Sequence, residues 1–147
     1  MIKAITSKDA LWVTTAKYAQ QCSWRAGEGL ANEMTSNRLD GWQRAFVALI
    51  DDQVVGYCTL AKTDCIPDVP YTPYIGYVFV DEAQRGKRLS QQLINSALAY
   101  AKGLGFDKVY LVSDHINLYE KYGFVKVDEK PAPWNPNQLE TIFMHLT

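Results

Sequence analysis

The sequence has few of the features that mark a membrane, secreted or metal-binding protein. Its three cysteines, Cys22, Cys58 and Cys65, are odd in number and lack metal-ligand spacing, so we expect reduced thiols, no metal and a cytoplasmic location. The N-terminal residues contain no apolar core of the kind that a signal peptide needs. No apolar run approaches the ~18 residues of a membrane-spanning helix, so we expect no membrane partner.

An excess of charge of either sign is also missing. With 15 Lys and Arg against 16 Asp and Glu, the formal net charge is −1, so we expect no nucleic-acid partner. The chain has no internal repeats and no low-complexity segments. Its hydrophobic content of 48% and aromatic content of 12% are typical of a globular protein. We expect a single domain over residues 1–147, and the sequence leaves the formation of a homodimer open.

The middle of the chain predicts a strand, a tight polar turn and a helix, in that order. Tyr74–Val80 is apolar, β-branched and aromatic, which is typical of a buried strand. Over Leu89–Ala101 the apolar residues recur at three- and four-residue spacing and form one apolar helical face. The turn between them contains Arg85, Lys87 and Arg88. A helix N-terminus beside such a turn can hold an anion such as a pyrophosphate, although a solvated basic turn explains the same residues.

The flanking segments predict an α/β fold of mixed order. Gly27 and Gly29 are expected to break the chain before a second helix, and 51–53 to join two strands of an antiparallel hairpin. The proline-containing segments 64–73 and 130–138 are expected to be loops. A short helix is expected after the capping pair Ser113 and Asp114, ending at Lys121. The remaining expected elements are strands at 2–6, 45–50, 54–61, 108–112, 124–127 and 141–146, and helices at 11–22, 30–37 and 89–103.

The turn before the central helix resembles a known motif. Val80–Ser90 is similar to the acyl-CoA loop of the GNAT superfamily of N-acetyltransferases, in which Arg or Gln is followed by two residues, Gly, one residue, and then Gly or Ala. Here Arg85 takes the first position. Arg88 and Ser90 stand where the family usually has small residues, so the Arg88 side chain has to point out of the loop.

A second segment supports the same resemblance. Leu118–Phe124 is similar to the family's LYEKxGF segment, and the two motifs occur in the family's order. The resemblance covers Val54–Phe124, and the two ends match only by pattern. It implies the GNAT fold, which is a central mixed sheet of about seven strands, splayed at the middle and flanked by about four helices.

The resemblance implies an acetyl-CoA-dependent N-acetyltransferase that moves an acetyl group to a primary amine of a small molecule by direct attack on the thioester. Acetyl-CoA would be the cosubstrate, and no metal is implied. The alternative is a non-catalytic acyl-CoA-binding or sensing domain with the same fold. The implied pantetheine contacts are the backbones of Val78, Phe79 and Val80. The implied pyrophosphate contacts are the N–H groups of Arg85, Gly86, Lys87, Arg88, Leu89 and Ser90.

The catalytic groups are less well defined. Releasing the proton of an amine with a pKa near 10.4 costs about 4.6 kcal/mol at pH 7, so the reaction needs a proton acceptor. The resemblance implies Tyr119 as the acid that protonates the departing thiolate, and a packing tyrosine is the alternative. The base stays open between His115, Glu33 and an ordered water, because the central strand has no carboxylate. His115 shares a helical face with Tyr119 if the helix has begun there. Val112 occupies the position, seven residues before Tyr119, at which many relatives carry a cofactor-contacting asparagine.

Overall fold

A mixed sheet of seven strands forms the centre of the protein, in a computed structural model that describes all of residues 1–147. The strand order is β1-β2-β3-β4-β5-β7-β6. Every neighbouring pair is antiparallel except β4 and β5, which are parallel. The strands are β1 Ile2–Ile5, β2 Arg44–Ile50, β3 Gln53–Ala61, β4 Tyr74–Val80, β5 Lys108–Ser113, β6 Val125–Ala132 and β7 Asn135–Leu146. The expected mixed sheet of about seven strands is therefore confirmed.

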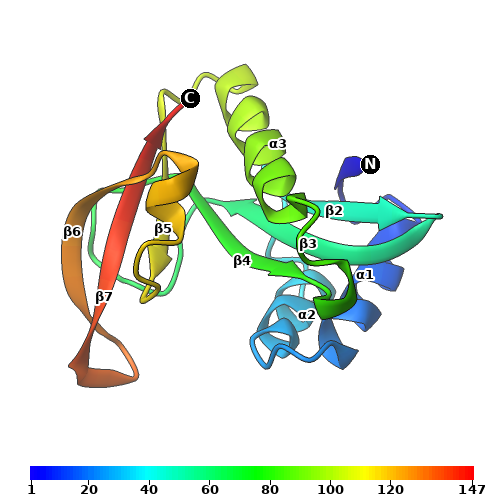
Figure 1. Cartoon of the computed structure of the whole chain (residues 1–147), viewed down its shortest axis with the longest axis horizontal. Helices are drawn as coiled ribbons and strands as arrows, with labels where there is room; N and C mark the ends of the chain where they lie inside the picture. The colour runs from blue at the N-terminus through cyan, green and yellow to red at the C-terminus, as the bar shows by residue number, and fades with distance from the viewer.

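Three α-helices cover the sheet, not the expected four or so. They are α1 Leu11–Gln21, α2 Gly27–Thr35 and α3 Leu89–Gly103. Figure 1 shows α3 on one side of β2 to β4, and α1 and α2 on the other. Two short 3-10 helices, η1 Glu82–Gln84 and η2 Tyr119–Tyr122, complete the set. None of the helices has the length and apolar character that crossing a bilayer requires.

The helix expected after Ser113 and Asp114 does not form. Ser113 is the last residue of β5, and its hydroxyl accepts a hydrogen bond from the His115 backbone N–H at 3.0 Å. Asn117 then adopts a left-handed conformation with a φ of 63°, which a right-handed helix cannot contain. Only the single turn of η2 is helical, so the helical-face argument for His115 and Tyr119 was wrong.

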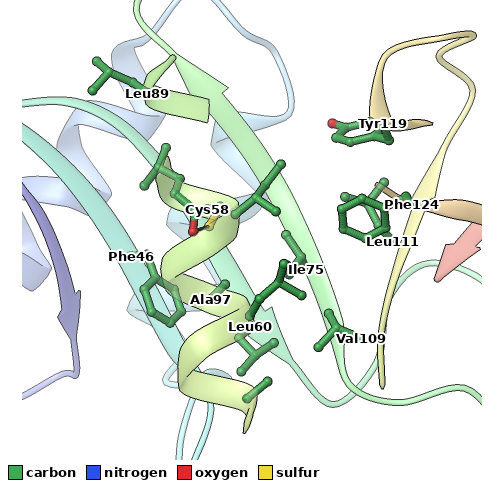
Figure 2. Packing of buried hydrophobic residues seen from close by; sticks show 14 of the residues in the cluster. Phe46, Cys58, Leu60, Ile75, Leu89, Ala97, Val109, Leu111, Tyr119 and Phe124 are labelled. Carbon is green, nitrogen blue, oxygen red and sulfur yellow. Dashed lines mark hydrogen bonds between the residues drawn. The ribbon is translucent and has the colours of Figure 1, made fainter. Parts of the chain in front are cut away.

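Strands β2 and β3 are buried on both faces, which explains their continuous apolar runs. Along β2, Ala45 and Val47 belong to the cluster that contains α1 and α2, while Phe46 and Ala48 belong to the cluster that contains α3. Figure 2 shows the second cluster, with Phe46, Cys58 and Leu60 close to α3. The hairpin expected here is confirmed, and its two turn residues, at 51 and 52, have φ values of 50° and 62°.

Gly27 and Gly29 do not break the chain as expected, because both lie inside α2. A β-carbon on Gly27 would stand 2.1 Å from the backbone oxygen of Ala19 in α1. One on Gly29 would stand 3.1 Å from the hydroxyl of Tyr77 in β4. These glycines therefore allow α2 to approach α1 and β4 closely, a tertiary role that a local pattern cannot reveal.

The segment 130–138 is mostly strand, not the expected loop. β6 and β7 form a long hairpin that pairs as far as Ala132 with Asn135. Pro131 is tolerated because β6 is the edge strand of the sheet. Pro136 is tolerated because β5 pairs with β7 only over 141–146, beyond this proline. The edge position of these residues explains why prolines did not end the strands.

The parallel pair β4 and β5 is joined at only one register position, Tyr74 with Tyr110. The backbone N–H of Tyr110 also donates to the carbonyl of Pro73 at 2.9 Å. Beyond that point the two strands diverge (Figure 1). The sheet is therefore open along the C-terminal half of β4.

Candidate active site

A cavity of about 950 Å³ lies where β4 and β5 diverge. The C-terminal half of β4, the turn that follows it, the end of β5 and η2 all contribute to its walls. Eight of the nine predicted cofactor residues line it: Val78, Phe79, Val80, Arg85, Gly86, Arg88, Leu89 and Ser90. The exception is Lys87, whose Nζ donates a hydrogen bond to the side-chain oxygen of Gln84 on the exposed side of the turn.

The turn between β4 and α3 is held by local hydrogen bonds and by two left-handed residues. The Asp81 carboxylate accepts from the Ala83 N–H at 3.0 Å, which begins η1. The Arg85 Nε donates to the Val80 carbonyl at 3.2 Å. Gly86 and Arg88 then have φ values of 86° and 59°. Left-handed residues within a turn can gather backbone N–H groups into an anion-binding hollow, beside the N-terminus of α3.

Arg88 occupies a strained position of this turn. It is the N-cap of α3 and takes a left-handed conformation, which costs a residue with a β-carbon roughly 1–2 kcal/mol. Its side chain makes no capping hydrogen bond and is exposed. Arg88 also lines the cavity, so the expected outward direction of its side chain stays a prediction.

Strand β4 carries a bulge beside the cavity. Tyr57 pairs with Phe79 and Thr59 with Gly76, so two steps along β3 correspond to three along β4. Tyr77, inside this interval, has a φ of 50°. A bulge leaves one residue outside the hydrogen-bonded ladder and changes the direction of the neighbouring groups. Such strained positions are found preferentially at functional sites.

Tyr119 lies on the opposite wall of the cavity, in η2. Figure 2 shows it on the β5 side, with Leu111 and Phe124, across from Ile75 of β4. Burial, and then the neighbouring Tyr122, raise the pKa of the Tyr119 hydroxyl to about 12. Tyr119 is therefore protonated near neutral pH and has a proton to donate, although it is a weaker acid than an unperturbed tyrosine. The hydroxyls of Ser90 and Tyr122 are 2.8 Å apart and connect the start of α3 to η2.

The two predicted base residues occupy different places. His115 is exposed and lines the same cavity as Tyr119, with the centres of the two rings 6.3 Å apart. Glu33 lies in α2 and lines a second, smaller cavity instead. The structure thus brings His115 together with Tyr119 and does not bring Glu33 there. Either role as a base stays a prediction.

Four carboxylates that sequence reasoning did not single out as catalytic also line the large cavity: Asp64, Glu82, Asp114 and Glu140. Asp64 comes from the loop between β3 and β4, and its Oδ1 accepts a hydrogen bond from the Cys65 N–H at 2.6 Å. Loss of hydration raises the pKa of the Asp64 carboxyl, although Cys65 opposes the rise. Glu140 is buried in β7, and burial followed by the charge of Asp114 raises its pKa.

A sequence signal for Glu140 existed, because it lies two residues before Ile142 on the same face of a strand. It was missed because the strand was expected to begin only at Thr141. No strand pattern marks Asp64 as a catalytic group, although its position in the loop before the central strand is compatible with a place in the acceptor pocket. Its loop has no regular secondary structure, so its approach to β4 depends on tertiary packing.

The cavity walls differ in charge from one end to the other. The turn before α3 contributes Arg85 and Arg88 together with Glu82, so this end carries one net positive charge, whereas Asp64, Asp114 and Glu140 belong to the β3–β4 loop and the β5 and β7 region. Such a distribution suits an anionic group at the first end and a cationic group at the second. The His, Cys, Asp and Glu side chains do not gather in any group of three that could hold a metal ion.

Comparisons with known proteins agree with this geometry. A sequence profile described as the Acetyltransferase (GNAT) family matches residues 10–124. Protein ElaA of Escherichia coli strain K12 is 33% identical over 100 residues, which cover 66% of this chain and 63% of ElaA. The match therefore spans less than two thirds of the length of that relative.

Solved structures share the fold at low sequence identity. An aminoglycoside 6'-N-acetyltransferase complexed with coenzyme A has a TM-score of 0.75 and 16% identity, covering 99% of this chain and 96% of that one. A GNAT family acetyltransferase from Elizabethkingia anophelis with acetyl-CoA bound has a TM-score of 0.69 and 16% identity, covering 100% and 97%. At these identities the likeness establishes a common fold.

Proposed function

The chain belongs to the GNAT family of acetyltransferases, and we propose that it transfers an acetyl group from acetyl-CoA to a primary amine of a small molecule. The observation that carries the proposal is the cavity at the divergence of β4 and β5, with the basic turn at one end and Tyr119 in its wall. Lining residues run from Ser23 to Glu140, which supports one catalytic domain over the whole chain.

We assign the cofactor contacts to the backbone groups that line this cavity. The exposed edge of β4 from Val78 to Val80 would pair with the amides of pantetheine in the manner of an added strand. The N–H groups between Arg85 and Ser90, together with the N-terminus of α3, would bind the pyrophosphate. Acetyl-CoA supplies the activated acyl group, and the chain's own groups orient it. The coenzyme A bound to the aminoglycoside acetyltransferase of the same fold supports acetyl-CoA as the cosubstrate.

The reaction then needs three groups of the protein. The amine nitrogen attacks the thioester carbon, and an N–H at the β4 bulge near Tyr77 would stabilise the negative charge that develops on the carbonyl oxygen. As the carbon–sulfur bond breaks, the thiolate takes the Tyr119 hydroxyl proton, and solvent later restores that proton. The ammonium form of the acceptor gives one proton to a base on the amine side of the cavity before it attacks, and the nitrogen releases a second proton to that base or to water as the amide forms.

We assign that base to Asp64. Its carboxylate lies against Gly76 at the start of the opening, and its raised pKa improves it as a proton acceptor. His115 remains an alternative on the side of Tyr119, and Glu33 a more distant one. The acceptor would be a cation before it reacts, and the carboxylates at this end of the cavity favour such a molecule.

The test is a screen of small amines with acetyl-CoA that follows release of free thiol, combined with calorimetric binding of CoA. Turnover of at least one primary amine, with the acetylated product identified by mass spectrometry, is the expected result. CoA binding with no turnover of any amine would favour a non-catalytic acyl-CoA-binding domain. Failure to bind CoA would contradict both functions.

A further inference from the structure

A second cavity of about 420 Å³ adjoins the large one. The two cavities share the wall formed by Asp64, Cys65 and Tyr77. The remaining lining residues come from α2 and the segment after it, from β3, and from the start of β4: Glu33, Arg38, Leu39, Gln43, Thr59, Ala61, Thr63 and Tyr74. A molecule that reacts beside Asp64 is therefore adjacent to this second cavity.

Two of the residues that line this second cavity, Tyr74 and Glu33, carry polar groups without a partner in the protein. The Tyr74 residue is 1% exposed, and its hydroxyl has no hydrogen-bond partner. Glu33 is half-buried and makes no ion pair, since the only ion pairs of the protein are Lys126–Glu129 and Lys130–Asp128. A buried hydroxyl left unpaired is costly, so these groups are suited to a ligand that can donate hydrogen bonds.

The charged residues that line the second cavity indicate the sign of the charge that the ligand carries. Glu33 and Asp64 are close enough that burial and the Asp64 charge together raise the pKa of Glu33. Arg38 is the one basic residue of the lining. It is exposed, and its effect on Glu33 is smaller than that of Asp64. Two carboxylates and one arginine leave a net negative charge, which a buried cation would offset.

We propose that the second cavity binds the distal ammonium group of an acceptor that carries two amines. The Glu33 carboxylate and the Tyr74 hydroxyl oxygen accept hydrogen bonds from that group, while the other amine lies beside Asp64 and reacts. This inference rests on the proposed function, because it names the acceptor class of the same site. It assigns Glu33 to substrate binding, in place of the role as a base that the sequence suggested.

The test compares linear diamines, from ethylenediamine to cadaverine, with monoamines of matched length. In the parent, the best diamine should exceed its matched monoamine in kcat/KM by about tenfold or more. Glu33→Gln should bring this ratio close to one, mainly through the KM of the diamine. Glu28→Gln, on the exposed side of the same helix and outside both cavities, should keep the ratio. A parent without preference, or a Glu33→Gln variant that keeps it, would overturn the proposal.

A binding measurement separates this inference from the proposed function. Calorimetry with the same diamines in the absence of acetyl-CoA should show binding to the parent and to Glu28→Gln. Binding should be at least about tenfold weaker in Glu33→Gln and in Tyr74→Phe, which removes only the unpaired hydroxyl. If no amine is acetylated but this pattern holds, the cation site stands and the transfer reaction fails. If amines are acetylated but diamines bind all four proteins equally, the site is wrong and the reaction stands.

Discussion

The Asp64 Oδ2 atom lies 3.0 Å from the point where a β-carbon on Gly76 would stand. The loop between β3 and β4 thus brings a carboxylate onto a position of the central strand that has no side chain of its own. The central strand lacks an acid in its sequence, and this contact provides one from outside the strand. Asp64 also belongs to both cavities, which places it between the two amines of the proposed acceptor.

Asp64→Asn keeps the size of the side chain and removes its ability to take a proton. With a true acceptor, turnover should fall by about 10²-fold or more, because general base catalysis typically contributes that much. Asp68→Asn is the matched control, since Asp68 is exposed in the same loop and lines neither cavity. Steady-state rates of thiol release check the expectation. Parental turnover in Asp64→Asn would leave His115 or an ordered water as the base, and His115→Ala then becomes the decisive variant.

Gly86→Val should weaken CoA binding by at least tenfold, or about 1.4 kcal/mol. Gly86 has a φ of 86°, and nothing lies within 4 Å of the β-carbon position, so the effect arises from the backbone conformation and not from a clash. A β-branched residue strongly disfavours this conformation, and the turn would change shape. Gly103→Val is the control, because that glycine also has open space around it and has no positive φ. Calorimetry on folded protein measures both, and equal affinities would place the pyrophosphate elsewhere.

The parts of this fold that could be predicted from sequence are those that depend on local sequence patterns. The β4 strand was predicted at its observed bounds, and α3 at its observed end, because each combines a clear period with glycine or polar residues at its limits. The β2–β3 hairpin was predicted for the same reason. The two motifs located the large cavity, since eight of nine predicted cofactor residues line it.

The remaining features depend on contacts between distant residues. The approach of α2 to α1 requires Gly27, but the sequence around Gly27 looks like a break. The contact of Asp64 with Gly76 crosses an irregular loop with three prolines. Glu33 was a candidate base because the central strand has no carboxylate, and only the folded structure separates its cavity from that of Tyr119. No hydrophobic periodicity and no sequence motif indicates which of these distant residues lie close together in the fold.

Arg88→Gly should stabilise the protein by up to about 1 kcal/mol. Glycine adopts the left-handed conformation of this residue without the roughly 1–2 kcal/mol cost, although it adds entropy to the unfolded chain. Arg88→Ala removes the same charge and keeps a β-carbon, so it should show no such gain. Thermal and urea denaturation compare the two variants. Equal stabilities of the glycine and alanine variants would contradict strain at this position.

Glu140→Gln should stabilise the protein at pH 7, and the gain should shrink as the pH falls. The pKa of the Glu140 carboxyl is raised above its ordinary value of 4.5 in the folded protein, so ionisation favours the unfolded state. This cost is absent below the unfolded pKa and develops as the pH rises through the folded one. Melting temperatures of the parent and of Glu140→Gln, measured from pH 4 to pH 7, test whether the gain in stability shrinks as the pH falls. An equal gain in melting temperature at pH 4 and at pH 7 would mean that the charge of Glu140 does not cause the gain.

Tyr119→Phe should lower turnover by about 10²-fold or more while leaving CoA affinity within a few-fold. The substitution keeps the ring, which is 8% exposed and packs against Phe124 and Phe143 with ring centres 6.1 Å away in each case, so stability should change little. Only the hydroxyl is lost, and with it the proton that we assign to the departing thiolate.

The control for this change is Tyr122→Phe, which removes the neighbouring hydroxyl that lies 2.8 Å from Ser90. Tyr122→Phe loosens the connection between η2 and α3, so it should affect CoA binding more than the chemical step. Single-turnover rates and CoA dissociation constants for both variants separate the two effects. If Tyr119→Phe turns over a true acceptor at the parental rate, Tyr119 only packs the cavity wall. The thiolate must then take its proton from solvent or from another hydroxyl of the cavity wall, such as that of Tyr122.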